Sequence, residues 1–191
     1  MDSWNALEPV ALRRAGDISA AFIQTGALDY RAAARFVSRL RYGRNSLAHD
    51  PLAVLREGRG TCSTKHALLR RLAIEQDLKI ALVVGIYEMN AQNTPGVGGV
   101  LQKYGLVSLP EAHCYLRFRG KRIDVTSENG GLRELKFVFE EDIFPEQIGE
   151  YKAALHRAFL QRRIAEGSVP GGRDLDDLWQ IREECIAALS R

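Results

Sequence analysis

Cysteine is scarce in this sequence: only Cys62, Cys114 and Cys185 occur among 191 residues, at irregular spacing. An odd number of scattered cysteines cannot form a complete disulfide framework, which excludes the class of small secreted proteins held together by such bridges. We therefore expect a reducing compartment. In that setting, a cysteine with unusual neighbours is expected to be reactive rather than to pair with another cysteine.

Long apolar runs are also missing. No segment approaches the roughly 20 consecutive apolar residues that a membrane-spanning helix requires. The first residues, MDSWNALEPVALRRAG, lack the charged lead and apolar stretch of an export signal. These absences predict a soluble, cytoplasmic protein.

No charge of one sign dominates the chain. The 27 basic and 24 acidic residues are mixed along it, and the net charge is +3. Because such a mixture produces no strong field, nucleic acid and membrane surfaces are not expected partners. The length fits one domain, which we place at residues 1–191, with a core over about 40–145 and helical extensions over 1–41 and 146–191.

Apolar spacing divides the chain into a helical first half and a sheet that follows. Apolar residues recur every three or four positions over 5–24 and 29–41, and further helices are expected from Pro51 to Gly58 and from about 61 to 76. The β-branched run LKIALVVGIYEM, residues 78–89, predicts a central strand. Residues 90–110 contain four glycines and are longer than an ordinary connection, which indicates a functional loop.

The remaining segments complete an α+β fold. HCYLRFRGKRIDVTSE alternates like two strands joined at a glycine-containing turn, and KFVFEEDIF predicts another strand. Two helices are expected after Pro145, separated by GSVPGGRD, with Asp174 capping the segment LDDLWQIREECIAALS. The predicted architecture is a helical N-terminal half packed on an antiparallel sheet, with extra helices at the C-terminus.

Cys62 stands at the predicted start of a helix, in EGRGTCSTKHALLRRLA. The free backbone N–H groups and the dipole of a helix N-terminus favour a thiolate, so this position lowers the pKa of a thiol. The preceding GRG lets the backbone approach a substrate closely, and the same N–H groups could hold an oxyanion. A nucleophile for acyl transfer requires both features.

Such a nucleophile also needs a base and a group that orients the base. If Arg119 and Gly120 form a two-residue turn, Tyr115 lies opposite Asp124 and His113 lies opposite Thr126. His113 and Asp124 are then diagonal neighbours on one face, about 7–8 Å apart between backbones, which their side chains can bridge. The other face carries an apolar set suited to the core: Cys114, Leu116, Phe118, Ile123 and Val125.

The order of GRGTCSTKHALLRRLA, a strand, a variable loop, HCYLRF and RIDVT resembles the transglutaminase-like superfamily, whose core is similar to papain. The resemblance covers roughly residues 40 to 130. It implies that Cys62 is the nucleophile, His113 the base and Asp124 the orienting carboxylate. The implied activity is thiol-dependent acyl transfer on a peptide, protein or small amide substrate, most simply hydrolysis, as in a cysteine protease. No metal and no organic cofactor is required.

The sequence also suggests further contact residues and alternative functions. Tyr42, Asn45, Gly60 and His66 could contact an oxyanion or a substrate, whereas His49 and His156 have no identifiable partner and are expected at the surface or in loops. The acyl group could pass to an amine instead of water, and the fold could serve as an inactive binding module. A zinc site made by Cys62, His66, His113 and Asp124 is a less favoured alternative.

Overall fold

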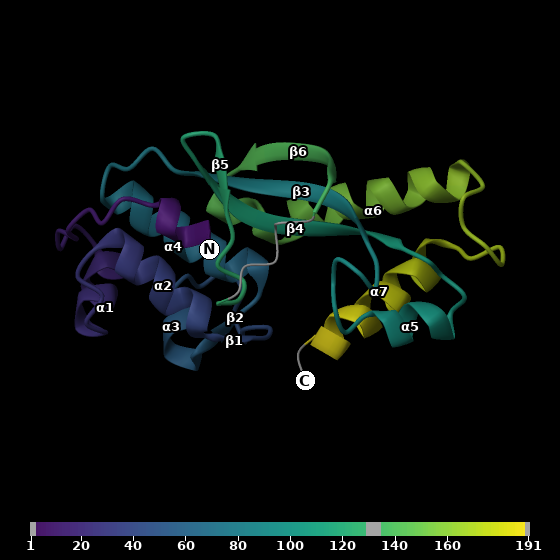
Figure 1. Ribbon diagram of the computed structural model, residues 1–191, viewed down its shortest axis with the longest axis horizontal. Coiled ribbons are helices and arrows are strands. Elements are labelled where there is room, and N and C mark those ends of the chain that lie inside the picture. Colours follow the sequence, from purple (N-terminus) through teal and green to yellow (C-terminus); the bar gives the residue numbers. More distant parts are fainter. Residues whose placement is uncertain (1–2, 129–134, 190–191) are drawn as a thin grey trace.

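The computed structural model describes residues 3–128 and 135–189. Its helices and strands form an α+β fold, as predicted (Figure 1). The helical first half consists of η1 (Ser3–Ala6), α1 (Asp17–Gln24), α2 (Tyr30–Arg39), α3 (Ala53–Glu57) and α4 (Cys62–Glu75). Two short strands, β1 (Arg41–Tyr42) and β2 (Arg59–Gly60), pair in parallel beside α4.

The main sheet has four strands in the order β5-β4-β3-β6, all antiparallel to their neighbours. They are β3 (Ala81–Met89), β4 (Leu109–Phe118), β5 (Lys121–Ile123) and β6 (Phe137–Ile143). The central strand β3 lacks a side chain at Gly85, where the ring of Phe137 packs; an added Cβ would lie 2.4 Å from Phe137 Cδ1. The remaining elements are α5 (Gly98–Lys103), η3 (Pro145–Ile148), α6 (Glu150–Ala165) and α7 (Leu175–Leu189).

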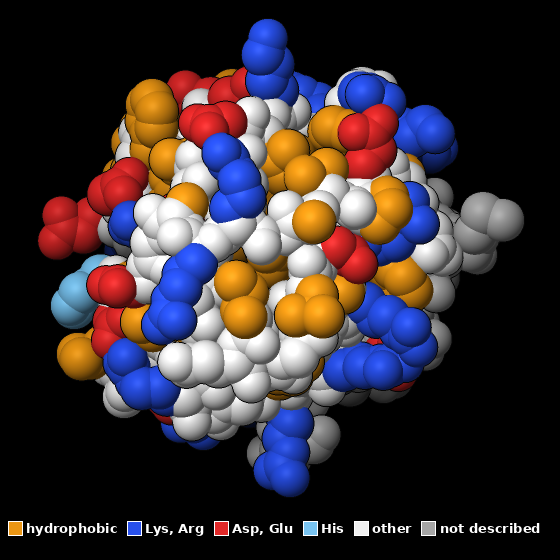
Figure 2. Space-filling view, turned by 90° about the vertical axis from the view of Figure 1, so that its left-hand side faces the viewer, with side chains coloured by type: hydrophobic (Ala, Val, Ile, Leu, Met, Phe, Trp, Pro, Cys, Tyr) orange, Lys and Arg blue, Asp and Glu red, His pale blue; other side chains and the backbone are white. Residues whose placement is uncertain are grey.

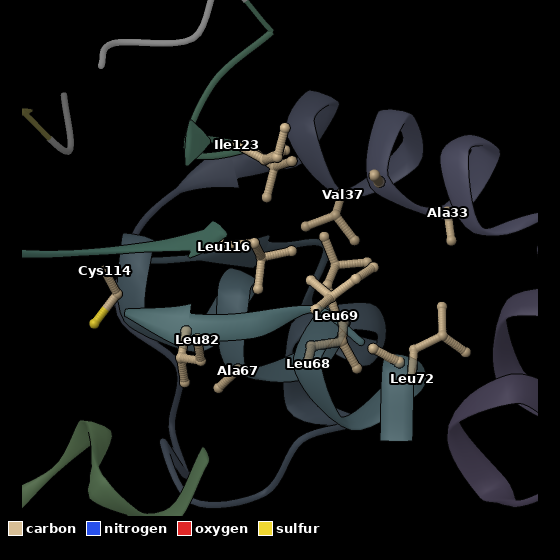
Figure 3. Close-up of a cluster of buried hydrophobic side chains, with 14 of the residues drawn as sticks. Ala33, Val37, Ala67, Leu68, Leu69, Leu72, Leu82, Cys114, Leu116 and Ile123 are labelled. Atoms are coloured by element: carbon tan, nitrogen blue, oxygen red, sulfur yellow. The ribbon is translucent and has the colours of Figure 1, made fainter. Parts of the chain in front are cut away.

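Two hydrophobic cores lie on the opposite faces of the sheet, because side chains alternate along each strand. In the first core, Leu82 and Leu116 meet the helices of the N-terminal half, and Figure 3 shows Leu69 of α4 between the sheet and Val37 of α2. In the second, Val83 and its neighbours on the same face meet α5, α6 and α7. The sheet therefore holds α4 and the C-terminal helices in fixed positions relative to each other.

The hairpin between β4 and β5 has the predicted register. Leu116 lies opposite Ile123 and Phe118 opposite Lys121, which leaves Arg119 and Gly120 as a two-residue turn. Both turn residues have positive φ, 49° and 74°, as a type I′ turn requires. Leu116 and Ile123 are buried in the first core, so the predicted apolar face is also confirmed.

Three expectations along the chain need correction. Residues 5–24 do not form one helix: η1 ends at Ala6, an extended segment follows Pro9, and α1 begins only after Gly16, because proline cannot continue a helix. The central strand begins at Ala81 rather than at residue 78. The expected loop over 90–110 contains α5, and its last two residues already belong to β4.

The C-terminal region has the two long helices that were expected. Asp174 Oδ1 accepts a hydrogen bond from the Asp177 N–H at 2.9 Å and so caps α7, as predicted. Ser190, where the expected segment ends, lies outside the described residues. Within the described ranges, no helix has the length and apolarity needed to cross a membrane. Figure 2, which faces the side of α1 and α2, shows Lys and Arg interspersed with Asp and Glu, in agreement with the balanced charge of the sequence.

Candidate active site

Cys62 is the first residue of α4, and the sequence around it defines the helix start. Thr61 caps the helix: its Oγ1 accepts from Thr64 N, and its own N–H donates to Thr64 Oγ1 at 3.0 Å. The first N–H groups of a helix have no carbonyl partner one turn earlier, so those of Cys62 and Ser63 are free of intrahelical bonds. Cys62 therefore stands at the start of the helix, as the sequence predicts.

His113 on β4 faces Asp124, which directly follows β5. Nε2 of His113 lies 3.3 Å from Oδ2 of Asp124; the side chain of Asp124 is buried, and that of His113 is 12% exposed. The other carboxylate oxygen, Oδ1, accepts from Thr126 N at 2.8 Å and from Thr126 Oγ1 at 2.5 Å. Thr126 thus fixes the carboxylate so that its second oxygen points at the imidazole, and the predicted diagonal pair is in contact.

The thiol and the imidazole perturb each other strongly. Burial alone would raise the pKa of the Cys62 thiol, but the positive charges of Lys152 and His113 outweigh it and lower the pKa to about 6. Burial would lower the pKa of His113, but Asp124 and the Cys62 thiolate raise it well above its ordinary value. At neutral pH the favoured state is a thiolate next to an imidazolium, which is the reactive form of a cysteine nucleophile.

Two cavities meet at Cys62. One, of about 250 Å³, is lined by Cys62, Ser63, Lys152, His156 and Trp179, among others. The other, of about 330 Å³, opens on Cys62, His113 and Asp124 and is bounded by apolar groups such as Tyr87 and Met89. The expected functional loop contributes Asn93, Thr94 and Pro95 to this second cavity. The thiol is therefore reachable from two sides, although Cys62 is only 7% exposed.

His66 lies one helical turn after Cys62 and is fully buried. Its Nδ1 lies 2.6 Å from the carbonyl oxygen of Cys62, and its Nε2 accepts from Val125 N at 2.8 Å. Because Nε2 accepts, the proton is on Nδ1, and the ring is neutral. Burial agrees with this, since it lowers the pKa of His66 to about 4. His66 thus fastens the helix start to the segment that carries Asp124, and both of its nitrogens are occupied by backbone groups.

The three other residues suggested as oxyanion or substrate contacts have different environments. Tyr42 lines both cavities beside Cys62. Burial raises the pKa of Tyr42, as do the negative charges of Cys62 and Glu111, so its hydroxyl stays protonated and can donate. Asn45 lines the first cavity, but its Nδ2 donates to Arg59 O and its Oδ1 accepts from Thr64 Oγ1, so its amide already joins the loop to α4. Gly60 packs on α4, where an added Cβ would lie 2.9 Å from Thr64 Oγ1.

Sequence reasoning missed Lys152 of α6. Lys152 is buried, only 8% exposed, and its ammonium donates to Ser63 Oγ at 2.8 Å, with Cys62 Sγ 3.9 Å away. Nothing in the local pattern distinguishes this lysine from the exposed ones. His156, one turn further along α6, corrects an expectation: it is 2% exposed rather than at the surface, and its Nε2–H donates to Pro110 O at 2.7 Å.

A buried ion pair next to the site was also missed. Glu111 lies two residues before His113 on β4, and both of its oxygens accept from Arg182 of α7 at 2.8 Å. The side chains are only 6% and 13% exposed. The spacing of two along a strand could have placed Glu111 on the face of His113, but only the folded chain brings α7 to it. This pair fixes α7, whose Ile186 lines both cavities.

No metal site is present among the residues that the structure describes: no three His, Cys, Asp or Glu side chains are grouped to hold an ion. His66 has no ring nitrogen available to bind a metal ion, since both nitrogens bond to backbone groups. The zinc alternative is therefore not supported by the geometry. Comparison with family models, curated proteins and solved structures gave no match to this chain.

Proposed function

We propose that this protein is a cysteine-dependent acyl-transfer enzyme that hydrolyses a peptide or other amide bond. Its catalytic triad is Cys62, His113 and Asp124, on a fold of the transglutaminase-like, papain-like kind. The observation that carries the proposal is the joint geometry: one cavity reaches all three side chains, and the His113 imidazole lies between the thiol and the Asp124 carboxylate. The resemblance of the motifs supports the same assignment.

The chemistry follows from the atoms in place. Nε2 of His113 faces Asp124, so Nδ1 is the nitrogen that takes the thiol proton. Sγ then bonds to the substrate carbonyl carbon, and the electron pair of the C=O double bond moves to the oxygen. When the oxyanion collapses, the C–N bond breaks, and His113 returns the proton to the leaving nitrogen. Water attacks the thioester, gives its proton to His113, and releases the acid and the Cys62 thiolate.

Cavity size limits what this site can accept. Volumes of about 250 and 330 Å³ lie near the lower limit for drug-sized ligands, about 300 Å³. Each cavity accommodates a side chain or a small acyl or amine group rather than a folded protein. Small amides and flexible peptide segments are therefore the expected substrates.

The decisive experiment is the pH dependence of Cys62 alkylation by iodoacetamide, followed at that residue by mass spectrometry. We expect a midpoint near pH 6, because the pKa of the thiol is about 6. His113→Ala should move the midpoint towards the ordinary thiol value of about 8.5. His49→Ala, an exposed histidine elsewhere, is the matched control and should change nothing. An ordinary midpoint in the wild type, unaffected by His113→Ala, would instead indicate a non-catalytic binding module.

A second assay separates water from amine as the acyl acceptor. The enzyme is acylated at Cys62, and decay of the thioester is followed with and without a small primary amine. If the enzyme is a hydrolase, the thioester should decay without the amine as fast as it does with the amine. Decay only with amine, with the amide as product, would identify an amine-accepting acyltransferase, and the hydrolase assignment would fail.

A further inference from the structure

Lys152 is a buried charged residue of the site that the triad does not use. Lys152 is only 8% exposed, and burying an ammonium is costly unless the protein replaces the hydrogen bonds that it makes to water. It donates to Ser63 Oγ at 2.8 Å and contacts Cys62 Sγ at 3.9 Å. An ammonium has three N–H donors, and Lys152 also lines the cavity on this side of the thiol. A donor is therefore available to a substrate in the cavity.

The position of this donor matches where charge develops during acyl transfer. The oxyanion oxygen is bonded to the carbon that Sγ attacks, so it lies close to Sγ, and an ammonium 3.9 Å from Sγ can reach an oxygen that lies on the side of Lys152. An effective donor must lie about 2.7–3.1 Å from that oxygen. His113 lines the other cavity at Cys62, so the base and this donor do not occupy the same place beside the thiol.

We propose that Lys152 is a catalytic residue that donates a charge-assisted hydrogen bond to the oxyanion, together with the free N–H groups at the start of α4. The inference rests on the proposed acyl-transfer function. Lys152 lies outside the segment that resembles the transglutaminase-like superfamily, on a helix that the motifs do not include. Ser63 acts as a positioning residue, because its hydroxyl holds the ammonium in place.

The surroundings of Lys152 keep it charged in the working pH range. Besides Cys62, the groups that face it are the Cys114 thiol and the Glu111 carboxylate of β4, the Arg182 guanidinium of α7, and His156 on its own helix. Burial and Arg182 lower the pKa of Lys152, but Cys62, Cys114 and Glu111 outweigh them and raise it. The ammonium is thus retained throughout the range in which Cys62 becomes a thiolate.

Two reagents separate an oxyanion donor from a residue that only stabilises the thiolate. p-Nitrophenyl acetate acylates a thiol through a tetrahedral oxyanion, whereas iodoacetamide alkylates it by displacement without one. Both react with the thiolate, so the ratio of the two rate constants at one pH cancels the thiolate fraction and the fraction of active protein. Each constant is measured on the full-length protein, with Cys62 modification counted by mass spectrometry.

For Lys152→Met we expect this ratio to fall by about 10²–10³, the usual loss when one oxyanion donor is removed. Lys152→Arg keeps a cation and should recover part of the ratio. Lys79→Met, which removes an exposed lysine, should leave the ratio at the wild-type value. The folding of each variant is checked by its melting curve. A loss of folded protein would not change the ratio of the two rate constants, because only the reacting protein contributes to both.

Two results would overturn the inference. If Lys152→Met slows acylation no more than alkylation, the lysine only lowers the pKa of the thiol. If Tyr42→Phe lowers the ratio by this amount and Lys152→Met does not, the side-chain donor is Tyr42. Two other results would contradict the proposed function itself. Cys62→Ala would release p-nitrophenolate as fast as the wild type, or the midpoint of Cys62 alkylation in the wild type would be that of an ordinary thiol.

Discussion

Removing Arg182 should destabilise the protein strongly, although this arginine is in neither the triad nor the motifs. Arg182→Met leaves the Glu111 carboxylate buried, at 6% exposure, without its two hydrogen bonds of 2.8 Å. Breaking a buried ion pair by removing one partner costs about 3–5 kcal/mol. Lys152, which stays charged, also lowers the pKa of Glu111 and partly compensates its charge, so we expect about 3 kcal/mol, the lower end of that range.

The matched control is Arg122→Met on the surface of the sheet. Arg122 also binds one carboxylate with two donors, Nε and Nη2 to Glu140, but its side chain is 41% exposed and that of Glu140 is 31% exposed. Solvent screens such a pair, and the expected cost is about 0–1 kcal/mol. Both variants remove a two-donor contact to one carboxylate and an arginine stacked on an aromatic ring, and Arg182→Met also removes a hydrogen bond to Glu183, so burial is the main difference between them.

The destabilisation should also depend on pH. Burial raises the pKa of Glu111, but Arg182 and His156 overcome it, so the pKa in the folded state is about 2. A lowered pKa stabilises the fold above the unfolded-state value, about 4.3, and this contribution is lost as the pH falls towards 2. Without Arg182 the pKa should rise, because burial then dominates. The variant should therefore regain stability between pH 7 and pH 5, where Glu111 does not titrate in the wild type.

The free energy of unfolding is measured by urea unfolding at pH 7 and pH 5. Equal slopes of this free energy against urea concentration would show that the variants expose the same surface on unfolding. At pH 7 the loss for Arg182→Met corresponds to a fall in Tm of about 6–12 °C at this chain length. Replacing both partners, as in Glu111→Gln with Arg182→Met, should restore most of the loss, because neither member of the pair is left as a buried charge without its partner. A cost no larger than that of Arg122→Met, unchanged at pH 5, would refute the reasoning.

Two further predictions concern the hairpin and the triad. Gly120→Ala should cost about 1–2 kcal/mol in urea unfolding, because Gly120 has a φ of 74° with open space around it, so only backbone strain opposes a side chain. Gly99→Ala, which has open space and no positive φ, should be neutral or stabilise by up to about 1 kcal/mol; an equal loss in both would contradict the turn geometry. Asp124→Asn should lower the pKa of His113 and so shift the alkylation midpoint of Cys62 upward, since the carboxylate and the thiolate both stabilise the imidazolium; an unchanged midpoint would mean that His113 does not depend on this contact.

Local sequence rules predicted the parts of the site that lie on single elements. The helix expected from about residue 61 puts Cys62 at its start, and alternation around Arg119 and Gly120 set the register that places His113 near Asp124. These features could be predicted because capping and strand alternation depend on residues a few positions apart. The break in the N-terminal helix could have been predicted by the same local rules, because Pro9 lies within the segment that was expected to be helical.

The surroundings of the thiol could not be predicted in this way. Lys152 and Arg182 reach the site through the docking of α6 and α7, which follows from the second core and not from the sequence near either residue. Each looks like an ordinary charged residue of an amphipathic helix. The buried polar contacts of α4, such as the two bonds of His66, likewise appear only when the segment after β5 packs against it.

Buried charges of both signs surround Cys62, and the positive ones allow the buried thiol to ionise. In the favoured state the negative groups are Cys62, Asp124 and Glu111, and the positive groups are His113, Lys65, Lys152 and Arg182. Burial penalises every one of these charges separately, but it also strengthens each attraction, because little solvent lies between them. Removing any one of these charges changes the electrostatic field at the others and shifts their pKa values. The effects of Arg182→Met and Lys152→Met on the thiol should therefore not be additive, since both variants change the field of the same Glu111 carboxylate.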